Sequence, residues 1–182
     1  MLNLDIWGED IDNSPLVFEA GDPDGVCLPT ERGFLPMPWL DNPSALLPMW
    51  MYREDGRAFE GDPRHALATV LKRYADRGLT PICGTELEFY LVDDSGKDLQ
   101  VVASPRSGKR RPSAAILSLR HLDAVDDYFA ALYDDAAAID IAAETASSEA
   151  GLGKFEMKLS HCHDMKAAED AGLFKLLVRC VG

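Results

Sequence analysis

The sequence lacks several features that would place it directly in a function class. No apolar run approaches the roughly 20 residues that a membrane-spanning helix needs, and the first residues, Met1–Asp5, carry no basic region or apolar core of a secretory signal. There is also no Walker motif, no G-x-G-x-x-G and no G-x-S-x-G. The sequence therefore gives little support to a membrane-bound protein, a P-loop protein, a Rossmann fold or a serine hydrolase.

Basic residues are scarce. The chain has 18 Lys and Arg against 31 Asp and Glu, a formal net charge of −13. This balance disfavours nonspecific binding to nucleic acids and to anionic membranes. It does not exclude an anionic substrate, because carboxylates can hold cations that in turn bind phosphate.

Cysteine is scarce as well, and its spacing indicates no metal site. None of the four cysteines forms a C-x-x-C pair: Cys27, Cys83, Cys162 and Cys180. In a chain without an export signal we expect reduced thiols and a cytoplasmic location.

The overall amino-acid composition is typical of a folded protein. The chain has 182 residues, of which 47% are hydrophobic and 27% are charged. This is too apolar for a disordered chain. The length fits one ordinary domain, or a small domain with part of another.

The first third of the chain, residues 1–61, is rich in turn formers and proline, which excludes long helices there. We predict short strands and loops. The apolar segment 46–53 is followed by Glu54–Gly56, a hairpin signal that leads into Arg57–Phe59.

From residue 62 the pattern changes to alternating helices and strands. Asp62 and Pro63 are suited to a helix start, and Gly78 to its end. The remaining predicted elements, in chain order, are a strand over 81–92, a loop over 93–113, a helix over 122–138, loop and strand over 145–158, and a helix over 164–181. We therefore predict an α+β core.

Two groups of acids stand out. Glu86 and Glu88 share one face of the 81–92 strand, and a divalent cation such as Mg²⁺ or Mn²⁺ would offset their repulsion. Glu149 lies in a glycine-containing loop, and Glu156 follows on a second strand beside Lys154 and Lys158. Taken separately, a solvated strand face with ordinary Glu–Lys pairs is the more common explanation of either group.

Two other clusters carry weaker signals. The segment His161–Asp164 invites a zinc interpretation but lacks the paired spacing of a structural zinc site, so surface or helix-capping roles are favoured. The basic cluster Lys109–Arg111 is most simply a solvated loop.

Taken together, the segments resemble the glutamine synthetase family, and more closely its bacterial γ-glutamylpolyamine synthetase-like branch. Single motifs are weak, but they follow the family's order over nearly the whole chain. They are Leu4–Gly8, Gly21–Pro29, Met37–Trp39, Asp55–Gly56, Asp62–Arg64, Gly84–Leu91, Thr145–Glu156, Ala167–Ala168, Asp170 and Lys175.

The resemblance implies a fold and a reaction. It implies a partial β-grasp N-terminal domain over residues 1–61, followed by the first part of a catalytic domain with antiparallel strands over 62–182. Family members use ATP to phosphorylate glutamate, and ammonia or a primary amine such as a polyamine then attacks the acyl phosphate. They assemble into homo-oligomeric rings and use Mg²⁺ or Mn²⁺.

The resemblance also implies site residues. Glu86, Glu88, Glu149 and Glu156 match acids that bind metal in the family. Glu144 falls where some members contact nucleotide. Asp5 aligns with an Asp that the family places in the neighbouring subunit's site to deprotonate ammonium, which would give it a catalytic role.

The sequence departs from the family pattern in two ways. Where the family has Pro-Gly-Gln, this chain has Leu152, Gly153 and Lys154, and an inward Lys154 would compete with a metal ion for Glu156. The chain also looks truncated at both ends, so we expect no catalysis by it alone. Two alternatives stay open: a noncatalytic assembly or regulatory module that joins a full-length relative, and a nonfunctional remnant. The amine acceptor also stays open among ammonia, ethanolamine, putrescine and other polyamines.

Overall fold

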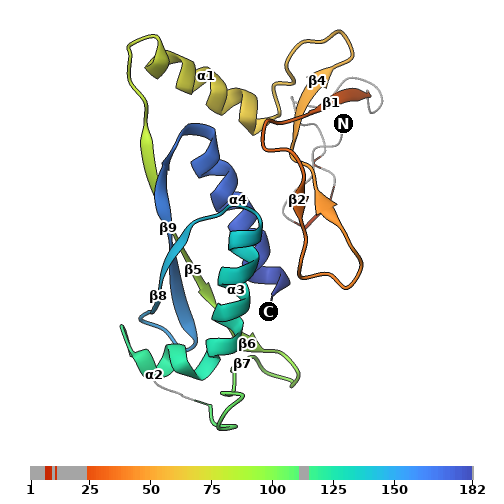
Figure 1. The fold of residues 1–182 in the computed structure, drawn as a ribbon. Coiled ribbons are helices and arrows are strands. Elements are labelled where there is room, and N and C mark those ends of the chain that lie inside the picture. Colours follow the sequence, from red (N-terminus) through yellow and green to blue (C-terminus); the bar gives the residue numbers. More distant parts are fainter. Residues whose placement is uncertain (1–6, 10, 12–23, 111–114, 182) are drawn as a thin grey trace. The chain divides into compact units, whose positions relative to one another are not determined.

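The computed structural model describes residues 7–9, 11, 24–110 and 115–181 (Figure 1). The chain divides into two compact units. The first comprises Met1–Leu35 and Ala45–Thr80, and the second comprises Pro36–Ser44 and Pro81–Gly182. Asp5 lies outside the described residues. These two units are defined by compactness, and the last change between them falls after Thr80. The domain boundary after residue 61 therefore stays a prediction.

The first unit contains a short antiparallel ladder. Strand β1 (Gly25–Pro29) pairs with β4 (Met49–Arg53). A separate pair is formed by the two-residue strands β2 (Leu35–Pro36) and β3 (Ala45–Leu46), at the two ends of the segment Pro36–Ser44. After β4 the chain turns through Gly56, whose φ is +81°, and a bridge joins Tyr52 to Ala58. The predicted hairpin is therefore confirmed.

Helix α1 (Pro63–Ala75) begins where Asp62 and Pro63 predict it. The Asp62 side chain is nearly fully buried and accepts hydrogen bonds from the Arg64 amide at 2.9 Å and the Met51 amide at 3.0 Å. One carboxylate thus caps the helix and ties it to β4. The helix ends before Gly78, whose φ of +68° confirms the predicted stop.

The second unit is built on a three-stranded antiparallel sheet in the order β5-β9-β8. Its strands are β5 (Ile82–Tyr90), β8 (Ala143–Ser148) and β9 (Lys154–His163). The strand expected over 81–92 is confirmed. The stretch expected as loop and strand over 145–158 contains two paired strands, because a turn through Gly151 and Gly153 reverses the chain between them.

Helices cover one face of this sheet. They are α3 (Asp126–Ala138), which lies against β8, and α4 (Asp164–Cys180), which lies against β5 and β9 (Figure 1). The short helix α2 (Leu119–Leu122) contacts β8 at one end of the sheet and leads through the 3₁₀ turn η1 (Asp123–Val125) into α3. Both longer helices are confirmed, and α4 continues through Gly172. Across the part of the chain that the structure describes, no helix is both long and apolar enough to cross a membrane.

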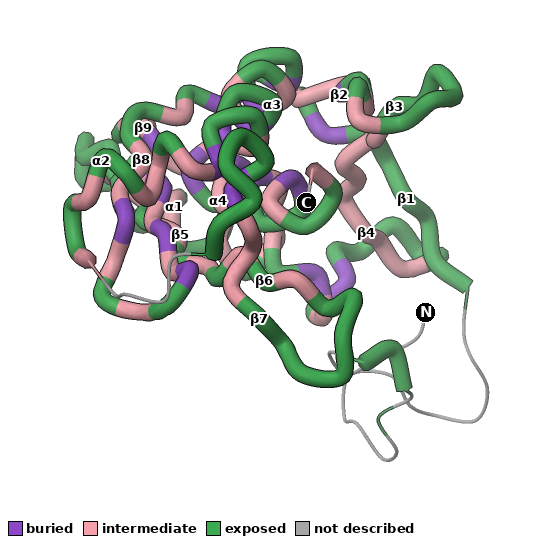
Figure 2. Tube along the Cα trace, turned by 90° about the horizontal axis from the view of Figure 1, so that it is seen from below, coloured by how far each residue is buried: buried purple, intermediate pink, exposed green. Residues whose placement is uncertain are grey.

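The core of the second unit lies between the sheet and α3 and α4. Along β9 three buried residues alternate with partly exposed ones (Figure 2). Because successive side chains of a strand point to opposite faces, the three buried ones share the face toward the helices. The buried apolar residues of this unit are Val125, Phe129, Leu132, Ala136, Ile139, Ile141, Phe155, Met157, Leu159, Ala167, Phe174 and Leu177. Val125 of η1 and Phe129 and Leu132 of α3 are among them.

The region predicted as a loop over 93–113 contains a short ladder. Strand β6 (Val92–Asp93) pairs with β7 (Gln100–Val101), and the Arg110 guanidinium donates to the Asp93 carboxylate and the Val101 carbonyl. Hydrogen bonds from the Ser95 hydroxyl and from Arg110 hold the pKa of Asp93 far below its usual range. Lys109 and Arg110 are exposed, as predicted for this basic cluster, and Arg110 in addition pairs with an acid that is 17 residues away in sequence.

Candidate functional site

The face of the sheet opposite α3 and α4 carries a row of charged side chains. We call this surface the open face. It comprises Glu86, Glu88 and Tyr90 of β5, Lys154, Glu156 and Lys158 of β9, and Thr145 and Ser147 of β8. The predicted sharing of one face by Glu86 and Glu88, and of another by Glu156 with both lysines, is confirmed, and strand pairing joins the two into one surface.

The register of β5 and β9 decides which charges meet. Glu86 is opposite Lys158, and Glu88 is opposite Glu156. Like charges directly opposite each other destabilise a sheet, and a glutamate pair at the centre of the face therefore requires positive charge nearby.

Two lysines supply that positive charge. The Lys154 Nζ lies 2.8 Å from Glu88 Oε2, and the Lys158 Nζ lies 2.6 Å from Glu86 Oε1 and 3.3 Å from Glu156 Oε1. The bond to Glu88 raises the pKa of Lys154, and the bonds to Glu86 and then Glu156 raise the pKa of Lys158. Lys154 does turn onto the open face, but its partner is Glu88 rather than the expected Glu156.

Glu149 stands in the turn that joins β8 to β9. The Ser147 hydroxyl donates to its carboxylate at 3.0 Å, and its own amide donates to the Lys154 carbonyl at 2.9 Å. Its charge adds a smaller contribution, after that of Glu88, to the raised pKa of Lys154. This acid therefore lies within electrostatic reach of the open face.

Glu144 is placed by a different contact. It lies on β8 and is exposed, and its carboxylate accepts a hydrogen bond from the Ser160 hydroxyl at 2.9 Å. The β8 register shifts between Ala143 and Thr145, and this bond holds Glu144 beside Ser160, two residues after Lys158. The role of Glu144 toward a nucleotide stays a prediction.

A register shift brings an imidazole next to this surface. The pairing of β5 with β9 shifts between Cys83 and Thr85. A Cβ added to Gly84 would lie 2.7 Å from His161 Nε2, so this ring lies over Gly84, two residues before Glu86. The sequence alone favours a surface or helix-capping role for His161. The available signal was the glycine, because a glycine inside a strand often marks close approach of another group.

The donor chemistry of the open face fits a hard divalent cation. Glu86, Glu88 and Glu156 are carboxylates on two adjacent strands, and Mg²⁺ and Mn²⁺ prefer such oxygens. In the side-chain arrangement described here, their oxygens are paired with lysine instead. Among the described residues, no three His, Cys, Asp or Glu side chains are grouped closely enough to hold a metal ion.

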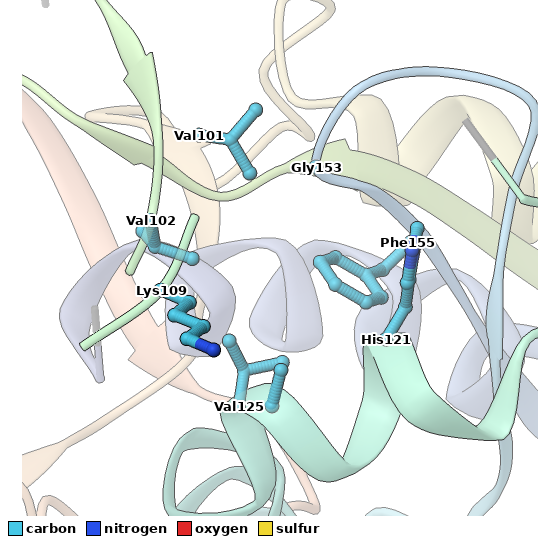
Figure 3. A pocket seen from close by; sticks show the side chains of 8 residues that line it. Val101, Val102, Lys109, His121, Val125, Gly153 and Phe155 are labelled. Carbon is cyan, nitrogen blue, oxygen red and sulfur yellow. The ribbon is translucent and has the colours of Figure 1, made fainter. Parts of the chain in front are cut away.

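A small pocket on the opposite side of the sheet offers no competing site. It is lined by Val101, Val102, Lys109, His121, Ala124, Val125, Gly153 and Phe155 (Figure 3). Its volume is about 20 Å³, which leaves room for about one water molecule. It is therefore too small for a nucleotide or an amino acid.

Comparisons with known proteins agree with the resemblance seen in the sequence. Residues 60–182 match the family model described as glutamine synthetase, catalytic domain. The chain is 31% identical over 180 residues to gamma-glutamylputrescine synthetase PuuA of Escherichia coli (strain K12), which covers 97% of this chain and 38% of that protein. It is 26% identical over 172 residues to glutamine synthetase of Pyrococcus abyssi (strain GE5 / Orsay), covering 94% and 34%. The chain thus spans little more than a third of the length of these relatives.

Solved structures agree on the fold. A crystal structure of a novel glutamine synthase homolog superposes with a TM-score of 0.77 at 23% identity, covering 96% of this chain and 38% of that one. A complex of GmaS with ADP superposes with a TM-score of 0.72 at 24% identity, covering 91% and 37%. The predicted combination of helices with an antiparallel sheet is confirmed.

Proposed function

The chain belongs to the glutamine synthetase family, and on that premise we propose that it forms part of the active site of an ATP-dependent ligase. The complete enzyme would join the γ-carboxylate of glutamate to ammonia or a primary amine. The family match covers residues 60–182, which include every residue of the open face.

One observation carries this proposal. Glu86, Glu88 and Glu156 come from two segments some 70 residues apart, and strand pairing places them on one surface of the sheet, opposite α3 and α4. A merely structural strand face gains nothing from two glutamates directly opposite each other. Their placement is explained if the face serves to bind cations.

The reaction has two steps. The γ-phosphoryl group of ATP passes to the glutamate γ-carboxylate, and the amine then displaces phosphate from the resulting acyl phosphate. Divalent ions, when bound, supply neutralisation of the phosphate charge. In this chain Glu86, Glu88 and Glu156 would hold them, with Glu149 contributing from the β8–β9 turn, and Glu144 would contact the nucleotide.

The finer assignments outside the open face are part of the same proposal. The strands β1 to β4 would belong to a partial β-grasp domain, and Asp5 would serve a neighbouring subunit's site in a homo-oligomer. Both assignments rest on the resemblance of segments before residue 62 to the family.

The names of the relatives bear on the acceptor. One relative is named for putrescine, and others are named glutamate–isopropylamine ligase of Pseudomonas sp and gamma-glutamylanilide synthase of Acinetobacter sp. We propose a primary amine, and a polyamine in the first instance, as the acceptor of the complete enzyme.

Metal-dependent melting tests the proposed site. A ligand that binds only the folded state raises the melting temperature, so Mn²⁺ at millimolar concentration should stabilise the chain. Glu156→Gln should reduce that shift. Glu54→Gln makes the same change of charge at an exposed position in the first unit and should leave the shift intact. The absence of a Mn²⁺ response both in the parent chain and in a variant with Lys154 and Lys158 replaced by Gln contradicts the proposal.

Activity is tested separately. The chain alone, given ATP, glutamate, Mn²⁺ and putrescine, should form no detectable γ-glutamyl amide, since most of the length of its relatives has no counterpart here. Product detected by mass spectrometry that disappears in Glu86→Ala would show that this chain is itself a catalyst.

An assembly module is the second candidate, and an exposed apolar stripe favours it. Val70 and Tyr74 of α1 are each 44% exposed and Leu79 is 55% exposed, and with Arg73 and Arg77 they line a cavity of about 370 Å³. The proposed occupant is a full-length member of the same family. Native mass spectrometry of this chain mixed with a full-length relative should show a complex of the two. The Val70→Asp variant should not form that complex. If the chain stays monomeric in the mixture, the assembly module is contradicted.

A further inference from the structure

The open face balances most of its own charge. Glu86, Glu88 and Glu156 contribute −3, and Lys154 and Lys158 contribute +2, which leaves −1 among these five groups. Each of the three carboxylates has an ammonium group within 3.3 Å. The face therefore holds positive charge in the places where a divalent cation would act.

We propose that Lys154 and Lys158 are internal counter-cations that compete with divalent metal for the open-face carboxylates, so that metal binding must displace them. This inference rests on the proposed function and specifies how its metal site is regulated by the chain itself. A metal ion added without displacement would meet two like charges at hydrogen-bonding distance from its ligands.

Lys154 is the better-held of the two competitors. Its side chain is 19% exposed, against 44% for Lys158. A Cβ on Gly151 would lie 2.9 Å from Lys154 Cβ, so the turn packs directly on the lysine stem. The backbone of Lys154 is fixed as well, since its carbonyl accepts the Glu149 amide at 2.9 Å. These contacts confine the ammonium group to the neighbourhood of Glu88.

Lys158 acts on two carboxylates at once. It bridges Glu86 and Glu156 across the pair of strands, and the Glu156 side chain is only 13% exposed. Because Glu88 is paired with Lys154, each of the three carboxylates forms an ion pair with a lysine. Removing one lysine therefore frees one or two ligands without altering the backbone that presents them.

The test is a direct measurement of Mn²⁺ affinity on the 182-residue chain, by the electron paramagnetic resonance signal of free Mn²⁺. Lys154→Gln should bind Mn²⁺ about tenfold more tightly than the parent chain, because it removes one hydrogen bond between charged groups. Lys158→Gln should also bind more tightly, and the double variant most tightly. Lys154→Arg, which keeps the charge, should keep the weak binding.

Lys72→Gln is the matched control. It removes the same charge from an ion pair with Asp76 at 2.7 Å on α1, so it reproduces the change in net charge away from the open face. Its Mn²⁺ affinity should equal that of the parent. If Lys154→Gln and Lys72→Gln bind equally, the inference is wrong while the metal site and the proposed function stand. If no chain binds Mn²⁺, the double variant included, both are wrong.

Melting without metal gives an independent readout. Lys154→Gln leaves Glu88 opposite Glu156 with less neutralisation, so its metal-free melting temperature should fall below that of Lys72→Gln. Mn²⁺ should then raise it by more than it raises the parent. A lysine that serves only as packing would lower the melting temperature without enlarging the response to metal, and that result would also overturn the inference.

Discussion

Met157 and Lys158 are neighbours in β9, yet they lie in opposite environments. Met157 is 0% exposed and packs between the sheet and its helices, whereas the Lys158 side chain is 44% exposed and paired with Glu86 and Glu156. The inner face is filled by atoms of this chain. The open face is balanced by charge, and its partners can be exchanged for water or ions. The first arrangement stabilises the fold, and the second leaves a surface available for ligands.

The largest predicted effect is a loss of stability caused by a substitution on the inner face. Met157→Ala should lower the free energy of unfolding by about 2–5 kcal/mol, because it removes a fully buried side chain and leaves a cavity. Urea denaturation followed by circular dichroism measures it. Lys158→Ala, one residue along, should cost about 1 kcal/mol or less. Equal losses at the two positions would contradict the contrast between the faces.

The next effect concerns the turn that joins β8 to β9. Gly153 has a φ of +71°, and an added Cβ would lie 2.8 Å from the Leu91 carbonyl oxygen. Gly153→Ala should therefore cost about 2–3 kcal/mol, from backbone strain of about 1 kcal/mol and displacement of that carbonyl. The measurement is again urea denaturation.

Gly78 is the control for this prediction. Its φ is +68°, but an added Cβ would meet nothing within 4 Å. Gly78→Ala should thus show only the strain of about 1 kcal/mol. If Gly153→Ala lowers the free energy of unfolding no more than Gly78→Ala does, the backbone of the β8–β9 turn can rearrange at little cost. The turn would then not hold Lys154 in position.

A third, smaller effect concerns the packing of α3 on α4. The Tyr128 hydroxyl donates to the Val178 carbonyl at 3.0 Å, and Tyr128→Phe should cost about 1 kcal/mol at pH 8. Burial raises the pKa of Tyr128 above its ordinary value. Above about pH 10 the unfolded chain loses this proton while the folded chain keeps it, so this contribution is present below pH 10 and declines above it.

The measurement is a comparison of the parent and Tyr128→Phe at two values of pH. The destabilisation caused by Tyr128→Phe should shrink between pH 8 and pH 11, because the variant lacks the group whose titration weakens the parent. A difference that stays constant across this range would contradict the raised pKa.

Local pattern was enough to predict which residues share a face. Period-two alternation places Glu86 with Glu88 and Glu156 with Lys158, and the capping residues Asp62 and Gly78 mark α1, all as the structure has them. These features depend only on neighbours in sequence, where backbone geometry is regular.

Pairing between distant segments could not be predicted in the same way. The opposition of Glu88 to Glu156, the bond of Lys154 to Glu88 and the ladder of β6 with β7 all depend on register. Register is set by turn geometry and by the packing of the whole buried face, so a single strand's pattern does not contain it. The register shift that lays His161 over Gly84 is the clearest example.

The smallest predicted effect sharpens the comparison from the open side. Glu86→Gln should change the free energy of unfolding by less than about 1 kcal/mol, because the side chains of Glu86 and Lys158 are 58% and 44% exposed and Lys158 keeps Glu156 as a partner. The difference between variant and parent should shrink further in 1 M NaCl, where screening acts within about 3 Å. Urea denaturation at low and high salt measures both quantities. A loss of several kcal/mol that salt does not alter would mean that the open face contributes to the fold as the inner face does, and the contrast between a packed face and a charge-balanced face would then fail.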